Sequence, residues 1–245
     1  MFEEVEKKIH EVKRMSSEQM HDKSIAQILS SLSHELRTPL SILSSNLQLL
    51  KKNENLDTEI RVETFQLFEE ALGSVTRFLD QIYFLNLSNK GELKSQSTIF
   101  NVDDFLNRVL NQPQTLLYQS DRIKLATNFL NKEFCSDEVL LKHILTNLLD
   151  NALKFSSKEV SFRISSDDQY LNILIEDQGM GMPEDQIDYL FEPFTRGSNV
   201  KMISGSGLGL AIVKRSVDCL DGIIYVDSDV SKGTTIKLKI PADEC

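Results

Sequence analysis

A histidine inside a predicted helix is singled out as a possible nucleophile by the residues beside it. His34 lies within Ser33–Leu40 (SHELRTPL), and Glu35 could accept a hydrogen bond from one imidazole nitrogen while the other stays free to attack an electrophile. His34 is about 200° around a helix from both Leu32 and Leu36, so we expect it to face away from the apolar side of the helix that carries these two leucines. That position alone also fits an ordinary solvated histidine.

Pro39 makes the segment around His34 unusual. A proline inside a helix costs about 3 kcal/mol, because it removes one backbone hydrogen bond and clashes with the preceding turn. Here it frees the carbonyl of Glu35. A destabilising proline bend beside an exposed histidine indicates that the bend in this helix serves a function.

Three polar residues share one face of a second predicted helix. Asn147, Asn151 and Lys154 are spaced four and three residues apart within the sequence NLLDNALKF. An amide oxygen can coordinate Mg²⁺, and an ammonium group can neutralise a phosphate. Without other motifs, the same pattern also fits a polar helix face in water.

Two glycine-rich turns complete the set of candidate functional residues. Asp177 follows a predicted strand and precedes Gly179 and Gly181, so the backbone could approach a flat ligand closely. The run Gly205–Leu210 (GSGLGL) leads into a helix, where backbone N–H groups can cradle phosphate. It is not a P-loop, since no Gly-Lys-Ser/Thr follows, and it lacks the βαβ context of a dinucleotide fingerprint.

In this order, the motifs closely resemble the sensor histidine kinases of two-component signalling. SHELRTPL is similar to their phosphoacceptor box, and NLLDNALKF, DQGMGM, FEPF and GSGLGL are similar to the N, G1, F and G2 boxes of their ATP-binding domain. That domain shares its fold with gyrase, Hsp90 and MutL. The resemblance covers about residues 25–245, and residues 1–24 look like the coiled-coil signalling helix that precedes such a core.

The resemblance implies a phosphotransfer role for the first motif. His34 would accept the γ-phosphoryl group of ATP, and Glu35 would act as its base or orienting partner. Thr38, together with Glu35, occupies the position tied to dephosphorylation of a response regulator. Arg196, just after FEPF, matches a lid arginine that reaches the γ-phosphate.

The same resemblance implies a binding site for ATP and Mg²⁺. Asn151 would hold Mg²⁺, and Asn147 and Lys154 would lie near the phosphates. Phe155 would stack on adenine, and Asp177 would bind its amino group. The remaining ATP-binding positions lie in the glycine turns and the last strand: Gly179, Gly181, Gly205, Gly207, Leu208, Gly209 and Thr234. The last box departs from the usual Gly-x-Gly-Thr because Ser231 replaces its first glycine, so we expect intact adenine contacts and a stiffer turn.

The first half of the chain has the period of a helical hairpin. Residues Phe65, Phe68, Leu72, Val75, Leu79 and Ile82 recur every three and four positions, and Ala71, Phe78 and Leu85 form a second stripe. A single hairpin cannot bury two apolar stripes of one helix, so part of this apolar surface would be exposed to solvent. Pairing of the hairpins of two chains would bury it, and we therefore expect a homodimeric four-helix bundle. A polar break at 51–57 separates the two helices.

The second half mixes strands and helices, which predicts an α/β sandwich with helices on one sheet face, the Bergerat fold that the resemblance implies. We expect strands at 123–130, 160–165, 170–176, 223–226 and 234–240. The expected helices are 101–110, 137–155, 183–191 and 207–220. The predicted domains are residues 1–24 (signalling helix), 25–89 (dimerisation and phosphoacceptor), 90–98 (hinge linker) and 99–245 (ATP-binding).

Composition excludes other classes of protein. With 27 basic and 37 acidic residues in 245, the chain has a net charge of −10, which argues against nucleic-acid binding. No apolar run is long enough to span a membrane. The three cysteines, Cys135, Cys219 and Cys245, are far apart in sequence, and we expect reduced thiols in a cytoplasmic chain. The chain would equally suit the soluble part of a longer or membrane-associated sensor with an upstream input.

The sequence therefore predicts a homodimeric kinase core that phosphorylates His34 and passes the phosphoryl group to a response regulator aspartate. Three alternatives stay open: a phosphatase-dominant enzyme, a catalytically silent scaffold, and an ATPase of the same fold.

Overall fold

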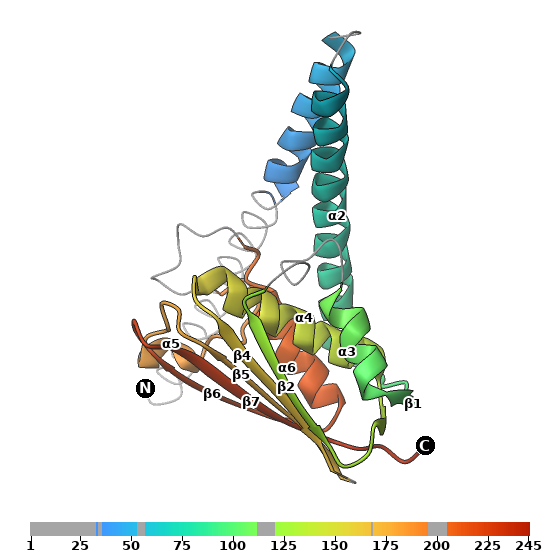
Figure 1. Ribbon diagram of the computed structural model, residues 1–245, viewed down its shortest axis with the longest axis vertical. Coiled ribbons are helices and arrows are strands. Elements are labelled where there is room, and N and C mark those ends of the chain that lie inside the picture. The colour runs from blue at the N-terminus through green and yellow to red at the C-terminus, as the bar shows by residue number, and fades with distance from the viewer. Residues whose placement is uncertain (1–32, 34–35, 53–56, 112–120, 168, 196–204) are drawn as a thin grey trace, which may run out of the picture. The chain divides into compact units, whose positions relative to one another are not determined.

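The structure is a computed structural model that describes residues 33, 36–52, 57–111, 121–167, 169–195 and 205–245. The chain forms two compact units, residues 1–75 and 76–245. Helix α2 (Thr58–Asn89) begins in the first unit and ends in the second (Figure 1). The predicted signalling helix, His34, Glu35 and most of the predicted break at 51–57 lie outside the described residues.

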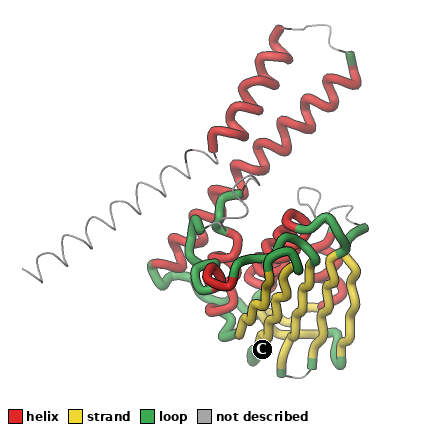
Figure 2. Tube along the Cα trace, turned by 90° about the vertical axis from the view of Figure 1, so that its left-hand side faces the viewer, coloured by secondary structure: helices red, strands yellow, loops and turns green. Residues whose placement is uncertain are grey.

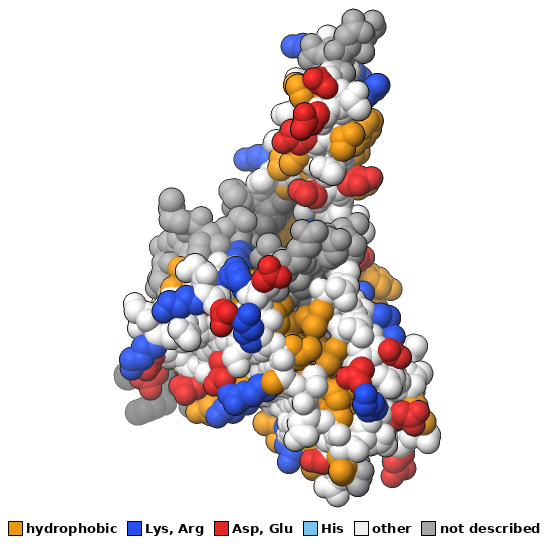
Figure 3. All heavy atoms as spheres, viewed as in Figure 1, with side chains coloured by type: hydrophobic (Ala, Val, Ile, Leu, Met, Phe, Trp, Pro, Cys, Tyr) orange, Lys and Arg blue, Asp and Glu red, His pale blue; other side chains and the backbone are white. Residues whose placement is uncertain are grey.

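The first unit is the expected helical hairpin, with residues 36–52 and the first part of α2 helical. The two apolar stripes of α2 differ in exposure. Ala71, Phe78 and Leu85 are buried, whereas Phe65, Leu72 and Leu79 are about half exposed. Other apolar side chains on the hairpin, including Leu40, Leu47 and Val62, are also exposed. On the face drawn in Figure 3, exposed apolar side chains of the hairpin lie among acidic ones. Among the described residues, the stripe that begins at Phe65 is therefore only partly covered within one chain.

A five-stranded sheet forms the centre of the second unit, in the order β2-β4-β5-β7-β6. Its strands are β2 (Ile123–Phe129), β4 (Val160–Ser166), β5 (Tyr170–Asp177), β6 (Ile223–Asp229) and β7 (Gly233–Pro241). The pair β2–β4 is parallel, and the other pairs are antiparallel. Alternate residues of β4, β5 and β7 are buried, because one face of the sheet carries the core and the other is open.

Within the part of the chain that the structure describes, the helices lie on one face of this sheet (Figures 1 and 2). They are α3 (Val102–Leu110), α4 (Glu138–Phe155) and α6 (Gly209–Cys219), and a short α5 (Glu184–Ile187) lies near β6. The α/β sandwich is confirmed, although α5 is shorter than the predicted helix 183–191. Among the described residues, no helix is long and apolar enough to cross a membrane.

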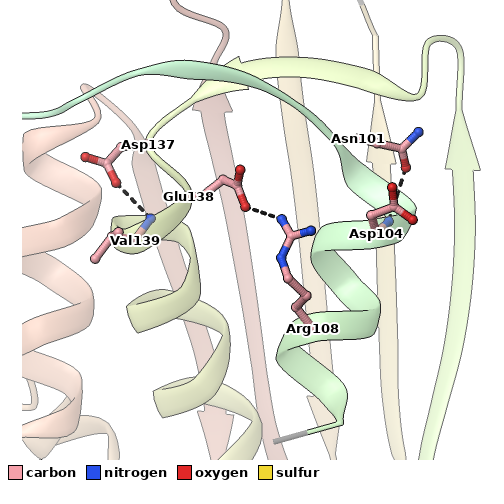
Figure 4. A network of polar contacts seen from close by, with 6 residues as sticks. All are labelled: Asn101, Asp104, Arg108, Asp137, Glu138 and Val139. Atoms are coloured by element: carbon pink, nitrogen blue, oxygen red, sulfur yellow. Dashed lines mark hydrogen bonds and ion pairs between the residues drawn. The ribbon is translucent and has the colours of Figure 1, made fainter.

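Two side-chain caps and one ion pair hold α3 and α4 in place (Figure 4). The Asn101 side chain accepts a hydrogen bond from the backbone N–H of Asp104 at 3.1 Å and so caps α3. Asp137 Oδ1 accepts from the backbone N–H groups of Val139 at 2.8 Å and Leu140 at 3.0 Å. Arg108 of α3 pairs with Glu138 in the first turn of α4.

A small sheet of two short strands was not predicted. β1 (Thr98–Asn101) pairs antiparallel with β3 (Glu133–Ser136), so Thr98, which we had placed in the linker, opens a strand.

The expectation of three reduced cysteines is wrong for two of them. Cys135 of β3 and Cys245 form a disulfide, with their Cα atoms 6.1 Å apart, while Cys219 is free. The cause is topological, because β7 ends beside β3 and brings together two cysteines that are 110 residues apart in sequence.

Candidate functional site

Helix α4 carries four of the predicted site residues on its last turns. Asn147, Asn151, Lys154 and Phe155 are half-buried there. The opposite face, including Leu141, Leu145 and Leu149, is fully buried against the rest of the unit. The helix is thus fixed by its apolar face and presents amide oxygens, a cation and an aromatic ring at its C-terminal half.

Asp177 ends strand β5, opposite Thr234 of β7 in the strand register. Its Oδ1 accepts a hydrogen bond from the backbone N–H of Gly179 at 2.8 Å. Burial raises the pKa of the Asp177 carboxyl, and the hydrogen bonds from the backbones of Gly179 and Thr234 partly offset that rise. A half-buried carboxylate without a cation among these neighbours suits a ligand that donates hydrogen bonds.

The turn after Asp177 lies directly against the end of α4. The backbone N–H of Met180 donates to the carbonyl of Phe155 at 3.2 Å. A Cβ added at Gly179 would lie 2.3 Å from that same carbonyl oxygen, so only glycine fits here. The predicted N and G1 boxes are therefore in contact.

The loop before α6 approaches the same helix from another side. A Cβ added at Gly209 would lie 2.8 Å from Asn147 Oδ1, and the Asn147 Nδ2 group donates to the carbonyl of His143 at 2.7 Å. Lys154 Nζ lies next to Gly205 and 5.2 Å from the centre of the Phe155 ring. The predicted N and G2 boxes are therefore in contact as well.

The FEPF segment joins the G2 box through its backbone. The N–H of Phe194 donates to the carbonyl of Gly207 at 3.0 Å. Phe194 has a φ of 63°, which a bulky residue adopts only where its surroundings impose it. Arg196 and the rest of the predicted lid to residue 204 lie outside the described residues.

Ser228 organises the last box and was not predicted. Its hydroxyl accepts from the backbone N–H of Met182 at 2.9 Å, donates to the carbonyl of Gly233 at 3.0 Å and lies 2.9 Å from Thr234 Oγ1. Ser231, the residue that replaces the usual glycine, has a φ of 65° and bonds the carbonyl of Met180 at 2.8 Å. The turn therefore keeps the left-handed backbone that glycine would adopt without strain.

Two further residues support the site, and no pattern in the sequence indicated their roles. Arg122 Nη2 donates to the carbonyls of Leu153 at 3.1 Å, of Lys158 at 3.2 Å and of Ser156, at the C-terminal end of α4. The His143 ring lies 4.9 Å from the Phe84 ring of α2. Burial lowers the pKa of His143, with a smaller contribution from Lys142, while Asp137 and Asp80 oppose the shift.

The second unit therefore brings together ten of the predicted positions: Asn147, Lys154, Phe155, Asp177, Gly179, Gly205, Gly207, Leu208, Gly209 and Thr234. Asn151 lies one turn beyond Asn147 on the same helix, and Gly181 is buried in the turn after Asp177. Thr38 belongs to the first unit, where it is exposed in the helix 36–52. Chemically, the cluster offers a carboxylate, an aromatic ring, amide oxygens, one ammonium group and a glycine loop ahead of a helix.

Two family models match the chain. Residues 24–91 match the His Kinase A (phospho-acceptor) domain, and residues 136–244 match the histidine kinase-, DNA gyrase B- and HSP90-like ATPase.

Curated relatives and solved structures agree with these two matches. The autoinducer 2 sensor kinase/phosphatase LuxQ of Vibrio vulnificus is 32% identical over 91% of this chain and 27% of that protein. The sensor protein CiaH of Streptococcus pneumoniae is 30% identical over 85% of this chain and 47% of that protein. The chain thus spans less than half the length of these relatives.

Two solved histidine kinases have a similar structure at 25% sequence identity. Acinetobacter baumannii AdeS aligns with a TM-score of 0.60 over 86% of this chain and 98% of that one. Full-length ShkA in complex with AMPPNP aligns with a TM-score of 0.61 over 89% of this chain and 46% of that one. With a phospho-acceptor hairpin followed by an ATPase domain, the chain belongs to the sensor histidine kinases of two-component systems.

Proposed function

We propose that this chain is the core of a sensor kinase that autophosphorylates His34 from Mg-ATP. The phosphoryl group then passes to an aspartate of a response regulator, and Glu35 and Thr38 support dephosphorylation of that regulator. The observation that carries the proposal is the contact of three motifs around the C-terminal half of α4. Asn147 and Lys154 lie against the glycine loop, and Phe155 lies against the turn that follows Asp177.

The residues at this site fit the adenine part of ATP. The half-buried carboxylate of Asp177 lies at the end of β5 and can accept a hydrogen bond from an amino group. Phe155 offers a half-buried ring on the neighbouring helix, and Gly179 leaves the space that a side chain would fill. Together they would hold a flat base with a donor at its edge.

The residues also fit a triphosphate with its cation. Lys154 supplies a positive charge beside Gly205, and the backbone N–H groups at the start of α6 favour negative charge. Asn151 would offer its amide oxygen to Mg²⁺, which would neutralise charge on the phosphates, and Asn147 would lie close to those phosphates. Among the described residues, no cluster of three or more His, Cys, Asp or Glu side chains could hold a metal ion.

Phosphotransfer requires the second unit to bring the nucleotide to His34. We propose that the segment 90–98 acts as the hinge and that Arg196 joins Lys154 in neutralising the transferred group. The regulator would dock on the hairpin around residues 41–45 and the facing part of α2. The exposed stripe of Phe65, Leu72 and Leu79 supports a second copy of the chain as the partner that completes a four-helix bundle.

The test is incubation of the purified chain with Mg-ATP labelled at the γ-phosphate. We expect label on the parent that is lost in acid and kept in base, as a phosphohistidine requires, and none on His34→Gln. His21→Gln, in the same chain, serves as the matched control and should label as the parent does.

Two other results would favour the alternatives. Steady release of phosphate without protein-bound label would indicate an ATPase of the same fold. Bound nucleotide with neither label nor turnover would indicate a scaffold, and added phosphorylated regulator would then distinguish a phosphatase.

A further inference from the structure

All three cysteines of this chain lie near the segment that connects α2 to β1 (residues 90–97, the connecting segment). Cys135 pairs with Ile99 in the small sheet directly after this segment, and Cys245 is bonded to Cys135. Cys219 Sγ lies 3.8 Å from the carbonyl oxygen of Leu93. None of these residues belongs to the nucleotide site described above.

The pair Cys135–Cys245 is positioned by contacts other than its own bond. After β7, the backbone N–H of Ala242 donates to the carbonyl of Gln169 at 2.8 Å, and that of Asp243 donates to the carbonyl of Cys135 at 3.0 Å. The second of these bonds places Asp243 beside β3, and the Cα atoms of the two cysteines are 6.1 Å apart, within the usual range for a disulfide. The two thiols are therefore held within reach of each other by the fold.

The same residues bind the connecting segment. Ser97 Oγ donates to the Asp243 carboxylate, and the backbone N–H of Gln96 donates to Asp137 Oδ2 at 2.7 Å. Asp137 also caps α4 through its other oxygen. Whatever fixes residues 242–245 to β3 thus also fixes one of the partners of the connecting segment.

The three thiols differ in access to a reactant from solvent. Cys245 is exposed and Cys135 is half-buried. Cys219 is half-buried, and burial together with the Asp137 carboxylate raises its pKa, so less of it is the reactive thiolate. Cys245 is the thiol suited to react first, and Cys135 is the thiol suited to resolve the product.

We propose that Cys135 and Cys245 form a reversible thiol–disulfide exchange site whose reactant is a small-molecule disulfide of the glutathione class. The Cys245 thiolate attacks that disulfide, forms a mixed disulfide and releases one small thiol. The Cys135 thiolate then attacks the Cys245 sulfur, and the second small thiol leaves. In total, two cysteine thiols lose two electrons and two protons, and one small disulfide becomes two thiols.

The consequence of oxidation is a covalent clamp on residues 242–245. It closes a loop that runs from β3 to the end of the second unit, since the two cysteines are 110 residues apart in sequence. It also keeps Asp243 beside Ser97, so the connecting segment becomes less mobile in the oxidised chain. This inference stands independently of the phosphotransfer proposed above.

The experiment uses the full chain with Cys219→Ser, which removes the third thiol. The protein is equilibrated with oxidised or reduced glutathione, remaining thiols are alkylated with N-ethylmaleimide, and the intact mass is measured. We expect oxidation to remove both alkylation sites without leaving glutathione bound. Cys135→Ser in the same background should instead keep one glutathione on Cys245, because nothing resolves the mixed disulfide.

The second readout is thermal unfolding of the same samples. The oxidised form of Cys219→Ser should melt roughly 5–15 °C higher than its reduced form, and the Cys135→Ser variant should show no such difference. Hydrogen exchange at the Asp243 amide should slow on oxidation. A glutathione adduct that persists on Cys245 with Cys135 present, or a disulfide only between chains, would overturn the proposed site. Equal melting and exchange in both redox states would overturn the clamp.

Discussion

The Asp177 carboxylate and the backbone N–H of Gly179 are joined by a hydrogen bond of 2.8 Å, which folds the turn after β5 back onto the acidic group that begins it. Burial raises the pKa of this carboxyl. The ionised form, which an adenine amino group would need, is therefore the form that the folded protein disfavours. Removal of this charge should therefore weaken nucleotide binding but increase the stability of the folded protein.

Asp177→Asn should weaken ADP binding by roughly 10- to 100-fold, the effect of losing a hydrogen bond to a charged group. Because the folded-state pKa is raised, the contribution of Asp177 to stability is present in acid and is lost as the pH rises through that pKa. The variant should thus melt higher than the parent at pH 7, and the two should converge at low pH. Calorimetric titration with ADP and thermal scans check both parts. Asp227→Asn, an exposed change on β6, should alter neither.

His143 should make stability depend on pH in a different window. Its pKa is lowered, mainly by burial and then by Lys142, against the opposing carboxylates of Asp137 and Asp80. The unfolded chain therefore takes up a proton first as the pH falls below about 6.5. The free energy of unfolding should decrease from pH 7 to pH 5.5 and be flatter in His143→Gln. Urea titrations across this range provide the measurement, and parallel curves for the two proteins would contradict it.

Arg122→Gln should loosen the C-terminal end of α4. The guanidinium group donates to three carbonyls there, at Leu153, Ser156 and Lys158, where a positive charge also favours the helix dipole. We expect a loss of about 1.5–3 kcal/mol in stability together with weaker ADP binding. Arg163→Gln is the matched control, because Arg163 pairs with Glu176 on the open sheet face. An equal cost for both variants would contradict a special role for Arg122.

Ser231→Gly should stabilise the second unit. Ser231 has a φ of 65°, a backbone conformation that costs a residue with a side chain about 1 kcal/mol. We expect a gain of about 0.5–1 kcal/mol, since glycine removes this strain but gives up some entropy. Ser231→Ala keeps the strain and should leave the urea midpoint where it is.

Leu72→Lys should separate the proposed dimer. Leu72 is about half exposed within one chain, on the stripe that we assign to the partner. A buried lysine in that interface should raise the dimer dissociation constant roughly tenfold or more, as sedimentation velocity can measure. Gln66→Lys adds the same charge at an exposed polar position of α2. If both variants sediment as the parent does, the stripe is not the dimer interface.

Long, periodic elements of the fold could be predicted from the sequence, and short ones could not. Helix α4 was predicted from its amphipathic repeat, whereas the role of Asp137 as its cap was seen only in the structure. The four-residue strands β1 and β3 are too short for their alternation to be recognised. The bond between Cys135 and Cys245 depends on where β7 ends in space, which no local pattern encodes.

The candidate site divides in the same way. Asn147, Lys154 and Asp177 lie in motifs whose spacing indicates a ligand. Arg122 acts through backbone carbonyls, and Ser228 acts through the turns on either side of it. Such contacts leave no signature in the order of residues. They arise only when the end of a helix or strand meets a distant segment.

Helix α4 also places two tasks at opposite ends of one rigid rod. Its cap, Asp137, accepts a hydrogen bond from the backbone of Gln96, and its last residues, Lys154 and Phe155, belong to the proposed nucleotide site. The helix has 18 residues, so these ends are separated by about 27 Å at 1.5 Å per residue. No loop interrupts the helix, so it would move as one body. A tilt imposed at the Gln96 end would therefore also displace Lys154 and Phe155 at the other end.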